Sequence, residues 1–207
     1  MMQKTKTIFQ LIKHRHLFSK IFSNHLSFLE NPGQSVWGSI TEEDEAGIRY
    51  GTERAAKHEG PIIEIGALFG HTTNLLASLK GNGVPLVAVE NFRWNPFHIP
   101  GDAHRMFTKR TIRYAVDHCS TQIYDGNARD FYSENMNLKP SMIFIDAAHD
   151  CESVKKDIEW AVHSACPVVL GHDYSDFHPG VIKAVNESFG DRIKVFGSVW
   201  VHARDDG

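Results

Sequence analysis

Short apolar segments alternate with amphipathic ones along most of this chain. Runs of β-branched and other apolar residues predict β-strands over residues 62–65, 86–90, 122–124, 142–146, 168–171, 193–196 and 199–202. Between these runs, apolar residues recur at helical spacing. They predict helices over about 41–57, 72–80, 104–118, 128–135, 152–163 and 179–189.

The alternation predicts the fold class. Short strands separated by helices indicate βαβ units, and therefore a mostly parallel sheet with helices on both faces. The last two predicted strands flank Gly197-Ser198, a link too short for a crossover, so one of them must run antiparallel. We therefore expect one α/β, doubly wound domain over residues 41–207.

The N-terminal part has a different character. Residues 1–29 hold five basic residues and no acidic one, and their apolar residues recur at helical spacing. We expect residues 1–40 to form a basic amphipathic helical extension. Such a segment docks weakly on a membrane surface, or it packs on its own domain or on a second copy in a homo-oligomer. Packing is the more ordinary of these alternatives.

Composition narrows the class of protein. The chain has 207 residues and a net charge of −3, which argues against nucleic-acid binding. Its three cysteines are far apart, and no apolar run reaches the roughly 18 residues of a membrane span. We expect a cytoplasmic protein, either free or peripheral to the membrane. Histidine is unusually frequent, with 13 residues, and about half of them fall near the predicted carboxyl ends of strands.

The turn after the first predicted strand carries candidate ligand chemistry. Gly66 permits close approach of a ligand, and Gly70 with Thr72 opens a helix whose free amides attract an anion. A dinucleotide fingerprint would need glycine where Leu68 and His71 stand, and a P-loop would need Gly-Lys-Ser/Thr at 71–73.

The next two strands end in polar residues that suit a nucleoside. Glu90 ends the second strand, where a carboxylate can accept hydrogen bonds from both ribose hydroxyls. Asn127 follows the third strand, and its amide offers a donor and an acceptor to an adenine edge. Three such features at successive strand ends predict a nucleoside-containing ligand.

Together with the later strand ends, these residues resemble the class I S-adenosylmethionine-dependent methyltransferases. The resemblance rests on Glu64-x-Gly66-x-x-x-Gly70-x-Thr72, Glu90, Gly126-Asn127-Ala128, Ile145-Asp146-Ala147-Ala148-His149 and His172-Asp173-Tyr174. It is nearest to the small-molecule O-methyltransferases related to macrocin methyltransferases, and more distant to catechol O-methyltransferases.

The resemblance implies a fold and a cofactor site. The fold is a Rossmann-like, seven-stranded, mostly parallel sheet whose last strand is antiparallel. Gly66 and Gly70 would line the methionine end of S-adenosylmethionine, Glu90 would hold the ribose, and Asn127, where many relatives carry Asp, would lie by the adenine. The full set of implied cofactor-binding residues is Glu64, Gly66, Ala67, Gly70, Thr72, Glu90, Gly126, Asn127, Ala128 and Asp146.

Polar residues at the ends of the fourth and fifth strands are candidates for catalysis. Asp146, His172 and Asp173 could bind a divalent cation, with Mn²⁺ or Fe²⁺ better suited than Mg²⁺ to an imidazole. In similar enzymes the first and last of these positions bind metal, whereas His172 stands where relatives often have Asp or Glu. His149 lies where catechol-type relatives place a general base, and its ordinary pKa near 6.5 suits that role.

A loop over residues 91–103 separates the second strand from the next helix. Its Phe92, Trp94, Phe97 and His98, with His104 just after it, predict a lid over an acceptor. The alternative is that these aromatics pack beneath the loop as a small core.

We therefore expect an S-adenosylmethionine-dependent O-methyltransferase (EC 2.1.1.-) that methylates a hydroxyl of a sugar, polyol, phenol or secondary metabolite. His149 would be the general base, with or without a divalent cation. Activity should fall below about pH 6, as imidazoles protonate. The alternatives are an NAD-dependent Rossmann oxidoreductase and a cofactor-binding scaffold without catalysis. Against the oxidoreductase, this chain lacks the glycines of the dinucleotide fingerprint and a Tyr-x-x-x-Lys pair. A scaffold without catalysis would have no need of Asp146, His149 and Asp173.

Overall fold

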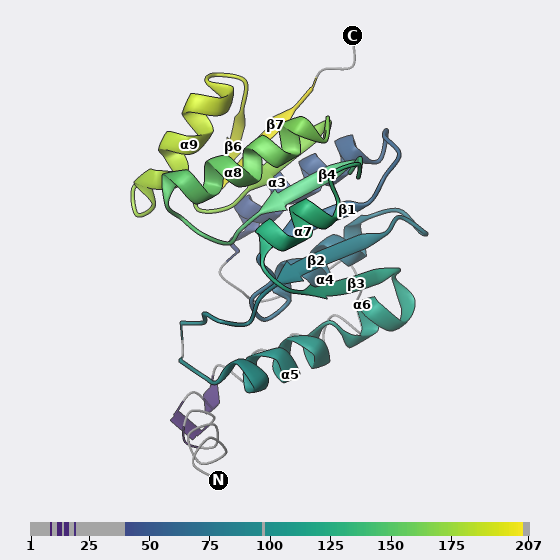
Figure 1. Cartoon of the computed structure of the whole chain (residues 1–207), viewed down its shortest axis with the longest axis vertical. Helices are drawn as coiled ribbons and strands as arrows, with labels where there is room; N and C mark the ends of the chain where they lie inside the picture. Colours follow the sequence, from purple (N-terminus) through teal and green to yellow (C-terminus); the bar gives the residue numbers. More distant parts are fainter. Residues whose placement is uncertain are drawn as a thin grey trace.

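The computed structural model describes residues 40–96 and 98–204, together with residues 9, 12, 13, 15, 16 and 19 (Figure 1). Most of the helical extension predicted over residues 1–40 lies outside these described residues, as does Phe97, and the helix labels begin at α3. Among the described helices, none combines the length and the apolar character that crossing a membrane requires.

Seven strands form one sheet in the order β3-β2-β1-β4-β5-β7-β6. Strands β1 to β5 are mutually parallel, whereas β7 runs antiparallel to both β5 and β6. Their bounds are β1 Ile62–Ile65, β2 Leu86–Glu90, β3 Thr121–Asp125, β4 Met142–Ile145, β5 Val168–Gly171, β6 Lys194–Phe196 and β7 Val199–Ala203. The predicted fold class is confirmed, including the antiparallel last strand.

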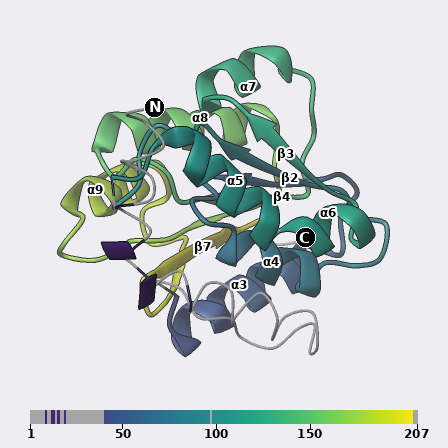
Figure 2. The same cartoon turned by 90° about the horizontal axis from the view of Figure 1, so that it is seen from below.

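Helices cover both faces of the sheet. They are α3 Glu42–Ala55, α4 His71–Leu79, α5 Gly101–Thr111, α6 Arg113–His118, α7 Ala128–Glu134, α8 Cys151–His163 and α9 Pro179–Phe189. Helices α7, α8 and α9 lie on one side of the sheet, and α3, α4 and α6 lie on the other (Figure 2). Each face of the sheet has its own hydrophobic core, one packed against α7, α8 and α9 and the other against α3, α4 and α6. Because side chains alternate along a strand, Ile63 and Ile65 of β1 belong to the former core and Ile62 to the latter.

The helix predicted over 104–118 is wrong in its bounds. Helical structure begins earlier, at Gly101, and is interrupted at Ile112, which separates α5 from α6. Ile112 is fully buried, and a Cβ on Gly70 would lie 2.2 Å from its Cγ2. The break therefore accompanies a tertiary contact between this segment and the start of α4, which helical periodicity does not encode.

The topology brings the polar strand ends to one edge. Parallel strands β1 to β5 end on the same side of the sheet, and the strand order reverses between β1 and β4. Ligands of doubly wound sheets bind at such a reversal. The loops from β2 to α5 and from β4 to α8 both lie at this carboxyl edge (Figure 1).

Candidate functional site

The turn between β1 and α4 requires glycine at two positions. Gly66 has φ +93°, and a Cβ there would lie 2.1 Å from the carbonyl oxygen of Asp146. The amide of Asp146 also donates to the carbonyl of Ile65, at 2.8 Å. Gly70 has φ +83° and caps the N-terminus of α4. The turn therefore runs directly against the end of β4, where the candidate catalytic residues begin.

The backbone of Leu68 connects this turn to neighbouring elements through hydrogen bonds. Leu68 has φ +45°, and its amide donates to Glu90 Oε2 at 2.9 Å. Its carbonyl accepts from Thr108 Oγ1 at 2.5 Å and contacts His104 Nε2 at 2.7 Å. The turn is thereby held both by the end of β2 and by α5, before any ligand binds.

His104 holds the β1–α4 turn through Leu68. The prediction that His104 belongs to a lid over an acceptor is therefore wrong. The side chain is fully buried, with ring centroids 4.8 Å from Phe69 and 5.2 Å from Phe92. Burial lowers its pKa, which favours the neutral ring and makes Nε2–H the donor to Leu68. Among the described residues, its Nδ1 has no hydrogen-bond partner.

Glu90 stands at the predicted position beside the turn. Its carboxylate accepts the amides of Leu68 and Phe92, each at 2.9 Å, and the side chain remains half-buried. A carboxylate has about four lone-pair sites, so capacity for ribose hydroxyls remains. The two hydrogen bonds orient the Glu90 carboxylate and leave it able to accept others.

Glu64 lies beneath the turn and is fully buried. Thr73 Oγ1 donates to its Oε2 at 2.5 Å, while its Oε1 has no hydrogen-bond partner within the described part of the chain. Burial raises the pKa of Glu64 to about 8, and the charges of Asp146 and Glu90 act in the same direction. The carboxyl of Glu64 is therefore mostly protonated at neutral pH, and a cationic ammonium group beside it would lower its pKa and favour the ionised form.

The remaining predicted cofactor residues occupy local structural positions. Ala67 and Thr72 are buried in the turn and in the first turn of α4. Gly126 donates to the carbonyl of Glu90 at 3.1 Å, and Ala128 opens α7. Asn127 caps α7: its Oδ1 accepts the amide of Asp130, and its Nδ2 contacts the Asp130 carboxylate. An adenine contact by the Asn127 side chain would therefore have to compete with this cap.

Three imidazoles surround the carboxylate of Asp173. Its oxygens lie 2.8 Å from His149 Nε2, 3.4 Å from His172 Nδ1 and 3.7 Å from His178 Nε2. Burial alone would raise the pKa of Asp173, but the contacts with His149 and His172 hold it well below its usual range. Asp173 has φ +61°, a costly backbone conformation for this residue at the end of β5.

His149 lies against Asp173 and is still partly open to solvent. The close contact of its Nε2 with Asp173 raises the pKa of His149, although partial burial opposes this. The side chain of His149 is about a third exposed, at 34%. It therefore combines an ordered position with access for a second molecule, as a general base needs.

His172 is buried deeper, with its two nitrogens facing different groups. Nε2 lies 2.9 Å from Ser198 Oγ and 3.5 Å from Asp44 Oδ2. Nδ1 faces Asp173 and lies 3.9 Å from Asp146 Oδ1. Burial alone would lower the pKa of His172, but the hydrogen bond to Asp173 and the nearby carboxylates raise it to about 9.

Asp146 completes the predicted metal-binding group. Burial raises its pKa to about 6, and His172 partly opposes that shift. Asp146, His172 and Asp173 each offer one ligand atom, and these three atoms all lie within 4.8 Å of one another. Ligand atoms around a cation with bonds of about 2.1 Å are about 3.0–3.4 Å apart. His172 Nδ1 and Asp173 Oδ1 have such a separation, 3.4 Å, whereas Asp146 Oδ1, at 3.9 Å from His172 Nδ1, would have to move closer to bind the same ion. The His172 nitrogen must lose its proton before it can ligate.

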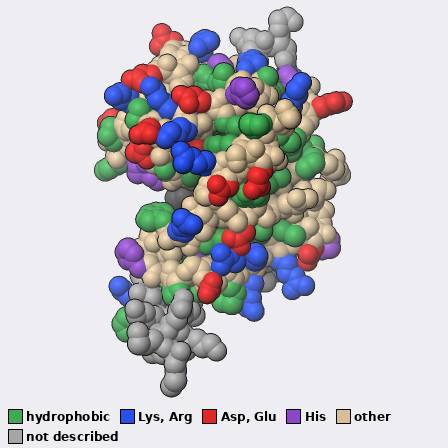
Figure 3. All heavy atoms as spheres, in the orientation of Figure 1, with side chains coloured by type: hydrophobic (Ala, Val, Ile, Leu, Met, Phe, Trp, Pro, Cys, Tyr) green, Lys and Arg blue, Asp and Glu red, His purple; other side chains and the backbone are tan. Residues whose placement is uncertain are grey.

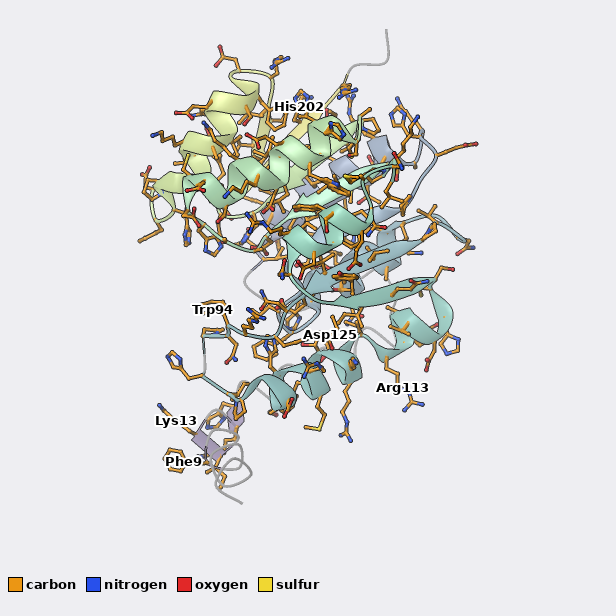
Figure 4. All side chains as sticks on the ribbon, in the orientation of Figure 1. Phe9, Lys13, Trp94, Arg113, Asp125 and His202 are labelled. Carbon is orange, nitrogen blue, oxygen red and sulfur yellow. The ribbon has the colours of Figure 1, made fainter. Side chains whose placement is uncertain are left out.

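The loop 91–100 has a buried side and an exposed side. Phe92 is buried, and Asn95 exchanges hydrogen bonds of 2.9 and 3.0 Å with the backbone of Ile99. Trp94 is 63% exposed and projects from the loop at the carboxyl edge (Figure 4). In the same orientation, the surface is notched between the part that carries α8 and α9 and the part that carries α5 (Figure 3). The packing alternative is thus confirmed for Phe92, whereas a lid role for Trp94 stays a prediction.

Sequence reasoning missed two residues of the site, Asp44 and Ser198. The segment around Asp44 predicts only a capped helix start, and Ser198 predicts only a turn. Asp44 and Ser198 are 154 residues apart in the chain and are joined by hydrogen bonds of 2.6 and 3.0 Å. Local patterns carry no signal of such a contact.

Comparisons with known proteins identify the fold. No protein-family model matches the chain, and no curated protein matches it. Solved structures do match. The O-methyltransferase from Bacillus cereus in complex with SAH has a TM-score of 0.59 at 17% identity, covering 98% of this chain and 100% of that one.

Two further structures come from biosynthetic enzymes. The O-methyltransferase TomG from Streptomyces achromogenes, involved in tomaymycin synthesis and solved with SAM, has a TM-score of 0.54 at 16% identity over 99% and 100% of the chains. The TDP-rhamnose 3'-O-methyltransferase of calicheamicin biosynthesis has a TM-score of 0.60 at 10% identity over 94% and 95%. At these identities the likeness establishes the class I methyltransferase fold.

Proposed function

We propose that this protein is an S-adenosylmethionine-dependent methyltransferase that acts on a hydroxyl of a small molecule. The observation that carries the proposal is one contact. The Gly66 turn, which is the expected cofactor loop, lies against Asp146, from which the cluster of His149, His172 and Asp173 extends. Cofactor binding and proton removal are therefore adjacent at the same edge of the sheet.

In this proposal the cofactor supplies an electrophilic methyl group. The Gly66 turn and the amides that open α4 receive the methionine end, and the buried Glu64 lies beneath them. Glu90, already oriented by two amides, accepts the ribose hydroxyls. Gly126, Asn127 and Ala128 border the adenine.

His149 takes the acceptor's proton at Nδ1 as the acceptor oxygen attacks, because Nε2 is buried against Asp173. Its bond with Asp173 orients the ring and stabilises the imidazolium that results. Asp146, His172 and Asp173 would hold a divalent cation (Mg²⁺, Mn²⁺ or Fe²⁺), which would lower the pKa of a bound hydroxyl. The donor set, with one imidazole and two carboxylates, supports that assignment.

The nature of the acceptor is supported by the edge itself. Trp94 and Phe177 are exposed at 63% and 91%, so an apolar or ring-bearing molecule has surfaces to contact. The chain's net charge of −3 gives no basis for nucleic-acid binding. We further propose a cytoplasmic location, with residues 1–30 packing on a second copy or touching a membrane surface.

Methyl transfer by the H149A variant tests the proposal. Radiolabelled S-adenosylmethionine is incubated with a panel of sugars, polyols and phenols, and label in the acceptor is counted. Because a general base contributes about 10²–10⁴-fold, H149A should lose at least a hundredfold in kcat while still binding the cofactor. The control is H118A, at the end of α6, which should retain full activity.

Methyl transfer by H149A at the wild-type rate would contradict the role of His149 as general base. No transfer by the wild type, together with reduction of NAD⁺ by members of the panel, would favour an oxidoreductase instead.

A further inference from the structure

The direction of His172 is set by groups that lie outside the strand ends. Ser198 sits in the turn between β6 and β7, and its hydroxyl contacts His172 Nε2 at 2.9 Å. The same hydroxyl donates to Asp44 Oδ1 at 3.0 Å. A hydroxyl has a single proton, so towards His172 it can only accept. Nε2 therefore carries a hydrogen and donates it to Ser198.

Asp44 is the buried anchor of this arrangement. It belongs to the first turn of α3 and is 1% exposed. Its Oδ2 accepts from the amide and hydroxyl of Thr41, each at 2.8 Å, and its Oδ1 accepts from the Ser198 amide at 2.6 Å. It thus joins α3 to the β6–β7 turn, while its Oδ2 lies 3.5 Å from His172 Nε2.

The consequence lies on the opposite side of the ring. With Nε2 committed to Ser198 and Asp44, only Nδ1 is left to face Asp146 and Asp173. A histidine that ligates a metal commonly donates its other nitrogen to a carboxylate or a similar group, which fixes the tautomer. The Asp44–Ser198–His172 chain has that form.

We infer that Asp44 is a positioning residue that presents His172 Nδ1 to a cation and makes the site prefer a nitrogen-seeking divalent transition metal, such as Fe²⁺, over Mg²⁺. The inference rests on the proposed function, because it concerns the cation of the same site. An imidazole ligand favours later first-row metals, whereas Mg²⁺ prefers oxygen and geometrically regular sites.

The test uses one ratio, the Mg²⁺ dissociation constant divided by the Co²⁺ dissociation constant, measured by calorimetry on the full chain. Co²⁺ serves as an air-stable probe of nitrogen ligation. The wild type should bind Co²⁺ more tightly than Mg²⁺. In D44N a donor replaces one acceptor, so the Ser198 hydroxyl can turn to donate to Nε2 and place the hydrogen on Nδ1. We expect the ratio to fall about tenfold or more, as for other residues behind a metal ligand.

T41A is the matched control. It removes the Thr41 hydroxyl that binds Asp44 and so weakens the cap of α3, but it leaves the contacts of Asp44 with Ser198 and His172. It should lower Tm and leave the ratio unchanged. H172E supplies an oxygen ligand instead and should also lower the ratio. If D44N does not fold, S198A removes the hydrogen-bond acceptor of Nε2 and should lower the ratio in its place.

Several results would overturn the inference. They are a wild type with no preference for Co²⁺, an H172E variant with an unchanged ratio, or D44N and T41A changing the ratio equally. Binding of S-adenosylmethionine is measured on the same samples. Loss of the metal preference with intact cofactor binding would reject this inference alone, whereas absent cofactor binding would reject the proposed function.

Discussion

At the scale of single residues, the environment gives similar side chains different tasks. His104, His149 and His172 all lie near one edge of the sheet, yet burial lowers the pKa of His104 while carboxylates raise those of the other two. The first is a neutral structural donor to Leu68, the second is the accessible partner of Asp173, and the third is held by Ser198. The excess of histidine in the sequence therefore serves several purposes.

The raised pKa of His149 predicts the pH dependence of activity. A general base must be neutral, so activity requires that His149 has lost its proton. Because Asp173 raises the pKa of His149 above its ordinary value near 6.5, acidification should reduce kcat at a higher pH than for an ordinary imidazole, rather than only below about pH 6. A kcat–pH profile measured at saturating substrate checks this. The D173N variant should shift the acidic limb to lower pH, and an unchanged limb would contradict the role of Asp173.

At the scale of elements, strands were more predictable than helix ends. The strands β1, β2 and β5 coincide with the predicted ranges, because a short buried strand is visible as an apolar run. The break at Ile112 was not predictable, because it accompanies packing against Gly70. The cap formed by Asn127, which was not predicted from the sequence, joins residues three apart, whereas the bond between Asp44 and Ser198 joins residues 154 apart.

The turn between β1 and α4 gives a prediction at this scale. In G66A, a Cβ would lie 2.1 Å from the carbonyl oxygen of Asp146, in a backbone conformation that disfavours alanine. We expect a loss of about 1–3 kcal/mol in the free energy of unfolding, and weaker cofactor binding because the turn must move. Urea denaturation measures the first effect.

G83A is the matched control for that experiment. Gly83 also has positive φ, but no heavy atom lies within 4 Å of the position that its Cβ would take. The variant should pay the backbone cost and keep its affinity for the cofactor. Equal losses of affinity in G66A and G83A would contradict the view that the β1–α4 turn is a binding element.

At the scale of the whole molecule, the topology determines where chemistry can occur. The reversal of strand order between β1 and β4 places the Gly66 turn beside Asp146. Helix α3, far from these residues in sequence, contacts β5, β6 and β7 and brings Asp44 beneath His172. Helix α5 is tied to the end of β3 by Arg105 and Asp125, at 2.6 Å, with Asp125 on the side of the sheet near α5 (Figure 4).

The sequence patterns were therefore sufficient for the sheet and for the set of residues at its carboxyl edge. They could not supply the partners of those residues. Predicting that Asp173 is surrounded by three imidazoles, or that Glu90 already binds two amides, requires the relative placement of loops that are distant in sequence. The cofactor assignments themselves remain predictions.

Calorimetric titration of the full chain tests the central claim most directly. S-adenosylmethionine, S-adenosylhomocysteine and NAD⁺ are each titrated into the wild type and into E90A, which removes the carboxylate expected to hold the ribose. We predict that both sulfur compounds bind the wild type, that E90A binds them at least about tenfold more weakly, and that NAD⁺ gives no binding heat. Binding of NAD⁺ alone, or equal affinities for the wild type and E90A, would contradict the account.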